Sequence, residues 1–433
     1  MSNKTLLHTT FNTLIEDITP QKLIAQQCYL DNDTLHIQET AYDLKAYKNI
    51  YLFGSGKAVV PMAEAVHELL KDRIHSTLIV GAYESDIKLD ECNYIQSTHP
   101  LPSQNSLIAA TALQNAMLTC KEDDLFIYLL SGGNSALVEL PEIGISLEEF
   151  QEATSLMLRG GMPIEAINCV RKHISAVKGG KLAALSKAQG LVLVLSDVIA
   201  DDLHAIGSAP LYFDSTTFRE ALSQLKTYGL LEKMPQSIQS FLGEGHEGKH
   251  PETPKEASKN ISHHILGSNT IVLEKADALL KKEGIETTLI KEPLEGYASD
   301  LAKSFLDLIT SHQAQKHCYL FGGEATVKVS GEGKGGRNQH LCLSLLNLLD
   351  GECDVTFLSA ATDGVDGNSK AAGALIDLHS RVNALAHRID PQHYLETFDS
   401  NTFFSKTGEL LITGPTHNNL LDIVMILIEP QTD

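Results

Sequence analysis

Short apolar segments of strand length recur along the chain, and each leads through a polar, mostly glycine-rich loop into a helical pattern. These segments are Ile50–Phe53, Leu125–Leu130, Leu191–Leu195, Cys318–Phe321 and Thr356–Ala360. Strands that are apolar throughout and alternate with helices predict parallel sheets covered on both faces. Ligands bind such sheets at the carboxyl ends of the strands, where all of these loops would lie. The pattern therefore predicts an α/β protein with its functional residues in the loops.

The chain is long enough to need more than one core. At 433 residues it exceeds the usual size of a single domain. The segment Gly243–Ser258 is rich in Gly, Pro and charge, so we expect domains at 1–245 and 246–433; a long surface loop within one domain is the alternative. The N-terminus reads as a helix, and Gly414–Asn419 is expected to follow the strand Glu409–Thr413 and open a last helix.

Charge and cysteine usage narrow the partners and the compartment. The formal net charge is −21, so the surface repels nucleic acid and anionic lipid. Seven cysteines without any C-x-x-C pair argue against disulfides or a zinc site and indicate a reducing compartment. The N-terminus does not resemble a signal peptide, and the longest apolar run is too short to span a bilayer. We expect a cytoplasmic protein without nucleic-acid or membrane partners.

Two loops of the N-terminal half are suited to anions. Gly54, Ser55, Gly56 and Lys57 follow a strand and open a helix, where free N–H groups and the helix dipole favour phosphate. The segment is neither a Walker loop nor a dinucleotide fingerprint, and a solvated lysine is the alternative. The loop 131–135 has the same arrangement: Gly132 and Gly133 precede Ser135, which either caps a helix or donates to a bound anion.

Further charged residues lie in the same half. The run from Arg171 to Lys181, which includes Lys178, would place its cations on one helix face, suited to an anion or simply solvated. Asp197 and Asp201 follow the strand Leu191–Leu195, where carboxylates serve as Mg²⁺ ligands, as a general base, or only as turn and cap residues.

The C-terminal half contains the most informative pair of loops, GKGGRN (333–338) and TDGVDG (362–367). The first carries Lys334 and Arg337 among glycines, and the second carries Asp363 and Asp366. Cations that neutralise phosphate beside carboxylates that hold a divalent cation are what phosphoryl transfer needs; two polar surface loops are the alternative. Glu324 ends a strand nearby and needs a cationic partner such as Arg337.

With these loops assembled, the chain resembles the glycerate 2-kinase family whose C-terminal half contains the MOFRL domain. The matching stretches, in order, are GSGKA, HPLPSQNSL, LLSGGNSAL, INCVRKHISAVKGGKLA, LSDV, GGEATV, GKGGRNQ, TDGVDG and TGPT. The resemblance implies a Rossmann-like N-terminal domain, a smaller C-terminal α/β domain with the MOFRL region at about 315–428, and an active site in the cleft between them. It also implies transfer of the γ-phosphoryl of ATP to D-glycerate, giving 2-phosphoglycerate, with Mg²⁺ or another divalent cation.

The resemblance assigns roles position by position. It implies that Lys57 and Arg337 stabilise the transferring phosphoryl group, that Asp363 positions or deprotonates the acceptor hydroxyl, and that Asp197 is catalytic. Asp201 and Asp366 are the expected metal ligands, although Asp197 and Glu324 compete for the metal. The expected substrate or nucleotide contacts are Gly54, Ser55, Gly56, Gly132, Gly133, Ser135, Arg171, Lys178, Glu324, Lys334, Asn338 and Asn419. The protein is expected to be a monomer or a homodimer.

The chain departs from the family pattern at three positions. Ala200 and Ala209 stand where glycine is usual, and His340 stands where Glu usually follows GGRNQ. If the family glycines are left-handed, each alanine costs on the order of 1 kcal/mol. Three other functions therefore remain open: a kinase for another small hydroxy acid, a hydroxypyruvate reductase using NAD(P)H, and a metabolite-binding protein without catalysis.

Overall fold

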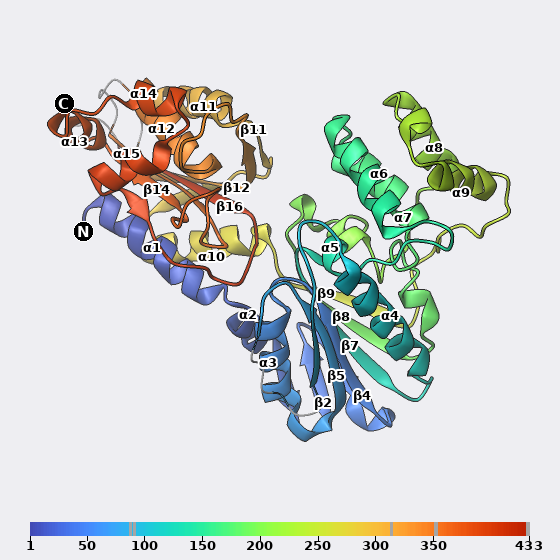
Figure 1. Cartoon of the computed structure of the whole chain (residues 1–433). Coiled ribbons are helices and arrows are strands. Elements are labelled where there is room, and N and C mark those ends of the chain that lie inside the picture. The colour runs from blue at the N-terminus through green and yellow to red at the C-terminus, as the bar shows by residue number, and fades with distance from the viewer. Residues whose placement is uncertain (86–88, 90–91, 312–314, 350–353, 430–433) are drawn as a thin grey trace. The chain divides into compact units, whose positions relative to one another are not determined.

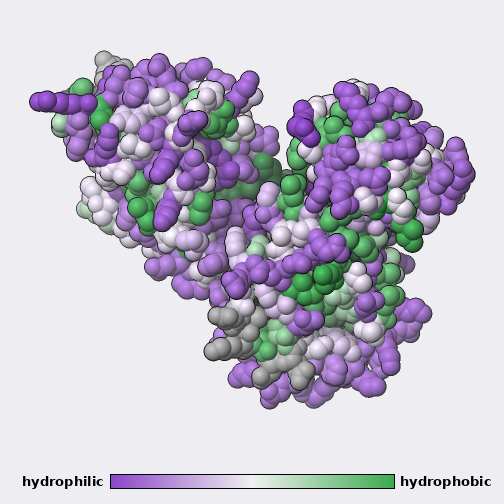
Figure 2. Space-filling model, viewed as in Figure 1, coloured by the Kyte–Doolittle hydropathy of each residue, from purple (hydrophilic) through white to green (hydrophobic). Residues whose placement is uncertain are grey.

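The computed structural model describes residues 1–85, 89, 92–311, 315–349 and 354–429, and the chain forms two compact units (Figure 1). One unit is Pro20–Leu266, and the other joins Met1–Thr19 to Gly267–Asp433. The sequence placed the division at 245/246, whereas residues 247–266 belong to the first unit and the first 19 residues to the second. Hydrophilic residues predominate on the face shown in Figure 2.

The first unit is built on a six-stranded sheet with the order β6-β5-β4-β7-β8-β9. The pairs β4–β5, β4–β7, β5–β6 and β7–β8 are parallel, as the apolar segments predict. The strands are β4 (Ile50–Ser55), β5 (Ile74–Gly81), β6 (Cys92–Gln96), β7 (Leu125–Leu130), β8 (Gln189–Leu195) and β9 (Ile261–Gly267). A small antiparallel sheet is formed by β1 (Cys28–Asp31), β2 (Thr34–Ile37) and β3 (Thr40–Asp43).

Helices cover both faces of this sheet, with α3 and α4 on opposite sides (Figure 1). Leu113 and Met117 of α4 pack on Phe126 and Tyr128 of β7. A second apolar cluster, away from the sheet, joins α6, α7, α8 and α9. The helices are α2 (Pro20–Gln27), α3 (Val59–Leu70), α4 (Gln104–Thr119), α5 (Asn134–Leu137), α6 (Leu147–Arg159), α7 (Ile164–Ile174), α8 (Phe218–Thr227) and α9 (Gln236–His246).

The second unit contains a seven-stranded sheet whose main path is β10-β12-β16-β13-β14-β15, with β11 paired to β12. The sheet is mixed, because β16 runs antiparallel to both β12 and β13. The prediction of a parallel sheet is therefore wrong for this unit, although β12 and β13 still run in the same direction. The strands are β10 (Glu286–Leu289), β11 (Leu294–Tyr297), β12 (His317–Thr326), β13 (Val355–Ala361), β14 (Gly373–Ile376), β15 (Leu410–Leu411) and β16 (Asp422–Ile428).

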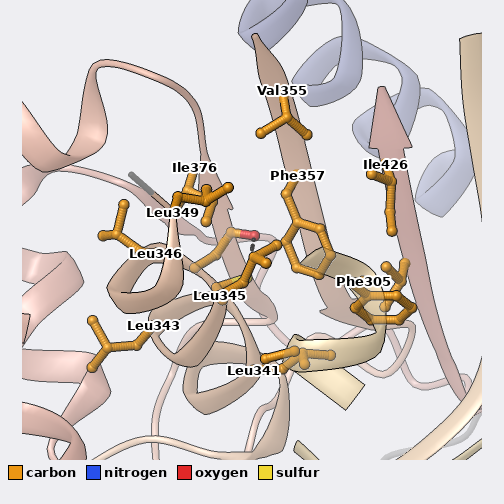
Figure 3. Packing of buried hydrophobic residues seen from close by; sticks show 14 of the residues in the cluster. Phe305, Leu341, Leu343, Leu345, Leu346, Leu349, Val355, Phe357, Ile376 and Ile426 are labelled. Atoms are coloured by element: carbon orange, nitrogen blue, oxygen red, sulfur yellow. Dashed lines mark hydrogen bonds between the residues drawn. The ribbon is translucent and has the colours of Figure 1, made fainter. Parts of the chain in front are cut away.

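The core of the second unit lies between this sheet and its helices. Phe305 of α11, Leu341 of α12, Phe357 of β13 and Ile426 of β16 belong to one buried cluster (Figure 3). The predicted last helix is wrong: the final apolar run is β16, which pairs with a strand on each side. The helices are α1 (Asn3–Asp17), α10 (Asn269–Lys282), α11 (Ala298–Ser311), α12 (Arg337–Leu348), α13 (Ser380–Ala386), α14 (Pro391–Glu396) and α15 (Ser400–Thr407).

Two further findings bear on the expected compartment. Within the described ranges, no helix has the length and apolar character needed to cross a bilayer. The six cysteines in those ranges are free, and Cys353 lies outside them.

Candidate active site

The loops after β4 and β7 lie side by side at the carboxyl ends of these adjacent strands, and hydrogen bonds join them. The Lys57 N–H donates to the Gly132 carbonyl at 2.9 Å, and the Ala58 N–H donates to Ser131 Oγ at 3.1 Å. Buried Ser55 lies 2.5 Å from Asn134 Oδ1 and 2.6 Å from the Tyr128 hydroxyl. Ser55 is therefore part of the support of this loop pair.

Gly132 and Gly133 allow three functional side chains to approach the backbone of this loop pair. A Cβ on Gly132 would lie 2.3 Å from Asp197 Oδ2, and one on Gly133 would lie 3.2 Å from Lys57 Cγ and 3.2 Å from His99 Cδ2. Lys57, Asp197 and His99 thus gather over two glycines at the ends of β4, β7 and β8.

His99 was not among the predicted site residues, although it lies in the matching stretch HPLPSQNSL. Partial burial and the charge of Lys57 lower the pKa of His99 to about 4, so its imidazole is neutral at pH 7. Apart from that stretch, the sequence gave no signal for it, because His99 reaches the site from a loop before α4 that carries no strand-end pattern.

The predicted basic face has a structural role. Helix α7 ends at Ile174, so Lys178 lies beyond it rather than on one face with Arg171. Lys178 is 1% exposed, and its Nζ contacts Glu139 Oε2 at 2.7 Å and the Ser135 carbonyl at 3.0 Å. Burial lowers the pKa of Lys178 to about 8, an effect that Glu139 opposes. Arg171 Nη2 also donates to the Ser135 carbonyl, at 2.9 Å. The geometry does not support substrate contacts for these two cations; they hold the loop of Ser135.

The loop after β8 contains the two alanines that replace the family glycines, and both are left-handed. The φ angles are +59° at Ala200, +54° at Asp201, +60° at Ser208 and +53° at Ala209. Ser208 lies 2.7 Å from the Ser135 hydroxyl, which ties this loop to the one after β7. The chain therefore retains the backbone conformation that glycine would favour and bears the steric cost of Cβ atoms there.

In the second unit, Arg337 begins α12 and is held by two carboxylates. Its Nε and Nη2 donate to Asp422 at 2.5 and 2.9 Å, and its Nη1 contacts Glu324. Asp422 opens β16 opposite Gly323 of β12 and Ala361 of β13, so it lies at the edge where β12 and β13 end. Burial raises the pKa of Asp422 to about 7, and the bonds from Arg337 oppose this rise.

Asp422 was missed because the sequence assigned its segment to a helix. The signal was a single carboxylate at the head of the apolar run DIVMILI. Such a residue is costly to bury unless a cation faces it.

The glycines of GKGGRN and TDGVDG serve the packing of loops against one another. A Cβ on Gly336 would lie 2.2 Å from Asp366 Oδ1, and one on Gly364 would lie 2.0 Å from the Gly414 carbonyl oxygen. Asp366 is 1% exposed and accepts the N–H groups of Asn338 and Gln339 at 3.0 and 2.8 Å. Asp366 therefore caps α12, and this geometry does not support the prediction that it binds metal.

The remaining predicted residues are partly occupied. Asn338 is buried and accepts from Ser359 at 2.5 Å. Asn419 Oδ1 accepts the Leu421 N–H at 3.1 Å, which fixes the turn before β16. Asp363 accepts the Val365 N–H at 2.9 Å and is half-buried. Lys334 is exposed, and its N–H donates to Asp399 at 2.9 Å.

Metal binding can be judged from the acidic residues. In the part of the chain that the structure describes, no three His, Cys, Asp or Glu side chains gather as a metal site. Magnesium in phosphoryl-transfer sites normally needs only one or two carboxylates beside the phosphates. Half-buried Asp197 and Asp201 fit that requirement, whereas the hydrogen bonds to Asp366 do not.

Cations and carboxylates at strand ends in both units define an α/β protein that binds a small anionic ligand. The family model "Domain of unknown function (DUF4147)" matches residues 6–243, and "MOFRL family" matches 317–422. The chain is 34% identical to glycerate 2-kinase of Pyrococcus horikoshii, covering 96% of this chain and 94% of that one. It is 36% identical to D-glycerate 2-kinase of Thermotoga maritima, covering 88% and 90% respectively. The crystal structure of glycerate kinase from Thermotoga maritima superposes with a TM-score of 0.86 at 34% identity, covering 98% and 99%.

The chain therefore belongs to the glycerate kinase family with a C-terminal MOFRL domain, and both the family and the fold class predicted from the sequence are confirmed.

Proposed function

We propose that this protein transfers the γ-phosphoryl group of ATP to the 2-hydroxyl of D-glycerate in the cytoplasm, with Mg²⁺ or a similar divalent cation. The observation that carries this proposal is the identity with two glycerate 2-kinases over at least 88% of the chain. The geometry supports it, because each unit presents a cation beside carboxylates at the ends of its strands.

The chemistry asks little covalent work of the protein. The 2-hydroxyl oxygen attacks the γ-phosphorus, the bond to the β–γ bridging oxygen breaks, and the hydroxyl proton passes to a carboxylate. Most of the catalysis then lies in positioning and charge stabilisation. A bound divalent cation, held by Asp197 and Asp201, would neutralise part of the phosphate charge.

The chain's own residues divide the remaining work. Arg337 offers a guanidinium already oriented by Asp422, so little reorganisation is needed when charge develops on the phosphoryl oxygens. Lys57 supplies a second cation from the other unit, beside the neutral His99. Asp363, half-buried at the end of β13, is the proposed acceptor of the hydroxyl proton.

The test is ADP formation from ATP that requires both D-glycerate and a divalent cation, with the phosphorylated carbon assigned by NMR of the product. Arg337→Ala should lower turnover much more than it weakens nucleotide binding. No ADP with D-glycerate would contradict the proposal, and ADP formed only with a related hydroxy acid would replace the acceptor.

The reductase alternative is disfavoured by the loop after β4. A dinucleotide fingerprint needs a third small residue where Val59 stands, and a Cβ on Gly54 would lie 2.7 Å from Val59 Cγ2. Hydroxypyruvate-dependent oxidation of NAD(P)H would reverse this preference.

A further inference from the structure

A cavity of about 480 Å³ opens within the second unit beside Arg337. Its walls are the end of β12, the GKGGRN loop, the first turn of α12 and the segment before α15. Cavities of roughly 300–1,000 Å³ hold ligands of drug size, and D-glycerate is far smaller than that. The cavity therefore suits a larger ligand than the phosphoryl acceptor.

The chemistry of the walls favours a flat, partly apolar ligand. His340 and Phe398 line the cavity as a stacked pair, with ring centroids 5.3 Å apart and planes within 6°. Val327 and Val329 contribute apolar surface from the other side of the lining, on the β12 segment. Aromatic side chains paired with aliphatic ones are a common receptor for a heteroaromatic base.

The position of Phe398 has a conformational cost. Its φ is +56°, a left-handed conformation that is unusual for a bulky residue. A Cβ on Gly333 would lie 2.5 Å from the Phe398 carbonyl carbon, so this glycine lets the loop close directly over that residue. The GKGGRN loop and the strained aromatic residue thus form one wall.

Arg337 lies at the polar end of the cavity, but its charge is more than balanced by nearby carboxylates. Asp422 and Glu324 both contact the guanidinium, so these three side chains carry a net charge of −1 when ionised. A polyphosphate would be repelled by that surplus unless it arrived with a divalent cation.

We propose that this cavity binds the base and ribose of the nucleotide, with the base on the Phe398–His340 pair and the phosphates directed toward Arg337. The inference rests on the proposed kinase function, because it assigns the nucleotide subsite of that reaction to the second unit.

The test compares Mg²⁺-ADP binding by calorimetry with steady-state kinetics in the full-length protein. Phe398→Leu removes the stacking face and keeps an apolar side chain; loss of base stacking predicts a Kd about 5- to 150-fold weaker. Val329→Trp fills the cavity from a position that is 63% exposed, so it should weaken nucleotide binding without disturbing the core. Tyr228→Leu, at an exposed aromatic residue of the first unit, is the matched control and should change nothing.

The outcomes separate this inference from the proposed function. Weaker Mg²⁺-ADP binding and a raised KM for ATP in both variants, with the KM for D-glycerate unchanged, support the subsite. Unchanged nucleotide binding in both variants, or a raised KM for D-glycerate alone, overturns it even if the kinase is active. If the wild-type protein binds Mg²⁺-ADP but does not phosphorylate D-glycerate, the proposed function fails and the binding measurements alone decide the subsite.

Discussion

Asp422→Asn should separate the orientation of Arg337 from its presence. The carboxylate accepts two N–H groups of the guanidinium; an asparagine has one oxygen and turns an N–H₂ toward the other donor. Removing one partner of a buried ion pair costs about 3–5 kcal/mol. Because the Arg337 side chain is 31% exposed and keeps Glu324, we expect about 2–3 kcal/mol of lost stability. Loss of one preorganised donor group costs about 10²–10³ in kcat, so with Glu324 still in place a loss of about 10- to 100-fold is expected.

The assay couples ADP release to a spectroscopic signal and reports kcat and both KM values. Glu409→Gln is the control, since Glu409 is a buried carboxylate of the same unit that pairs with Lys4 at 2.7 Å. It should lower stability and leave kcat near the wild-type value. An unchanged kcat in Asp422→Asn, or an equal loss in both variants, would refute the orienting role.

The same carboxylate predicts a pH dependence of turnover. With a pKa of about 7, Asp422 is ionised above pH 7, where it can accept both guanidinium N–H groups, and it becomes protonated below that pH. The kcat of the wild-type protein should therefore fall as pH drops through about 7. Asp422→Asn should lack this acidic limb, and a limb that persists in the variant would assign it to another group.

Two further substitutions test the loops of the first unit. Gly132→Ala places a Cβ 2.3 Å from the Asp197 carboxylate, and because a displacement of about 1 Å can cost 10²-fold, turnover should fall by up to that factor with little loss of stability. Gly243→Ala, where a Cβ meets nothing within 4 Å, is its control in both assays. Ala200→Gly and Ala209→Gly should each stabilise the protein by about 0.5–1 kcal/mol in denaturant unfolding, the left-handed cost of alanine less the entropy cost of glycine; loss of stability in both would contradict the strain argument.

The sequence predicted the buried strands well because continuous apolar runs have few other uses at that length. Leu125–Leu130 matches β7 residue for residue, and β4, β8, β12 and β13 contain their predicted segments. The final run Asp422–Ile428 was mistaken for a helix because seven apolar residues fit either structure. Its pairing with β12 and β13 decides the outcome, and such pairing depends on residues about 65 to 105 positions away.

The candidate site was predicted less completely, because burial cannot be read from a loop. Lys57 and Arg337 were found through their glycine neighbours, and both lie at strand ends as expected. Lys178 has the same local pattern, yet it is enclosed with Glu139. Asp422 was missed for the opposite reason, since its importance comes only from a partner 85 positions earlier in the chain.

The glycines beside these charges need a different interpretation from the one their sequence suggests. A glycine-rich loop is usually taken to bring backbone N–H groups to a ligand. In GKGGRN and TDGVDG, however, Gly336 and Gly364 face protein atoms within 2.2 Å of where a Cβ would be, and Asp366 already accepts the N–H groups that open α12. A substitution at either glycine would therefore displace a neighbouring loop whether or not a ligand binds there. Loss of activity after such a change cannot identify a ligand contact, and only changes at charged or aromatic side chains, such as Arg337 and Phe398, can do so.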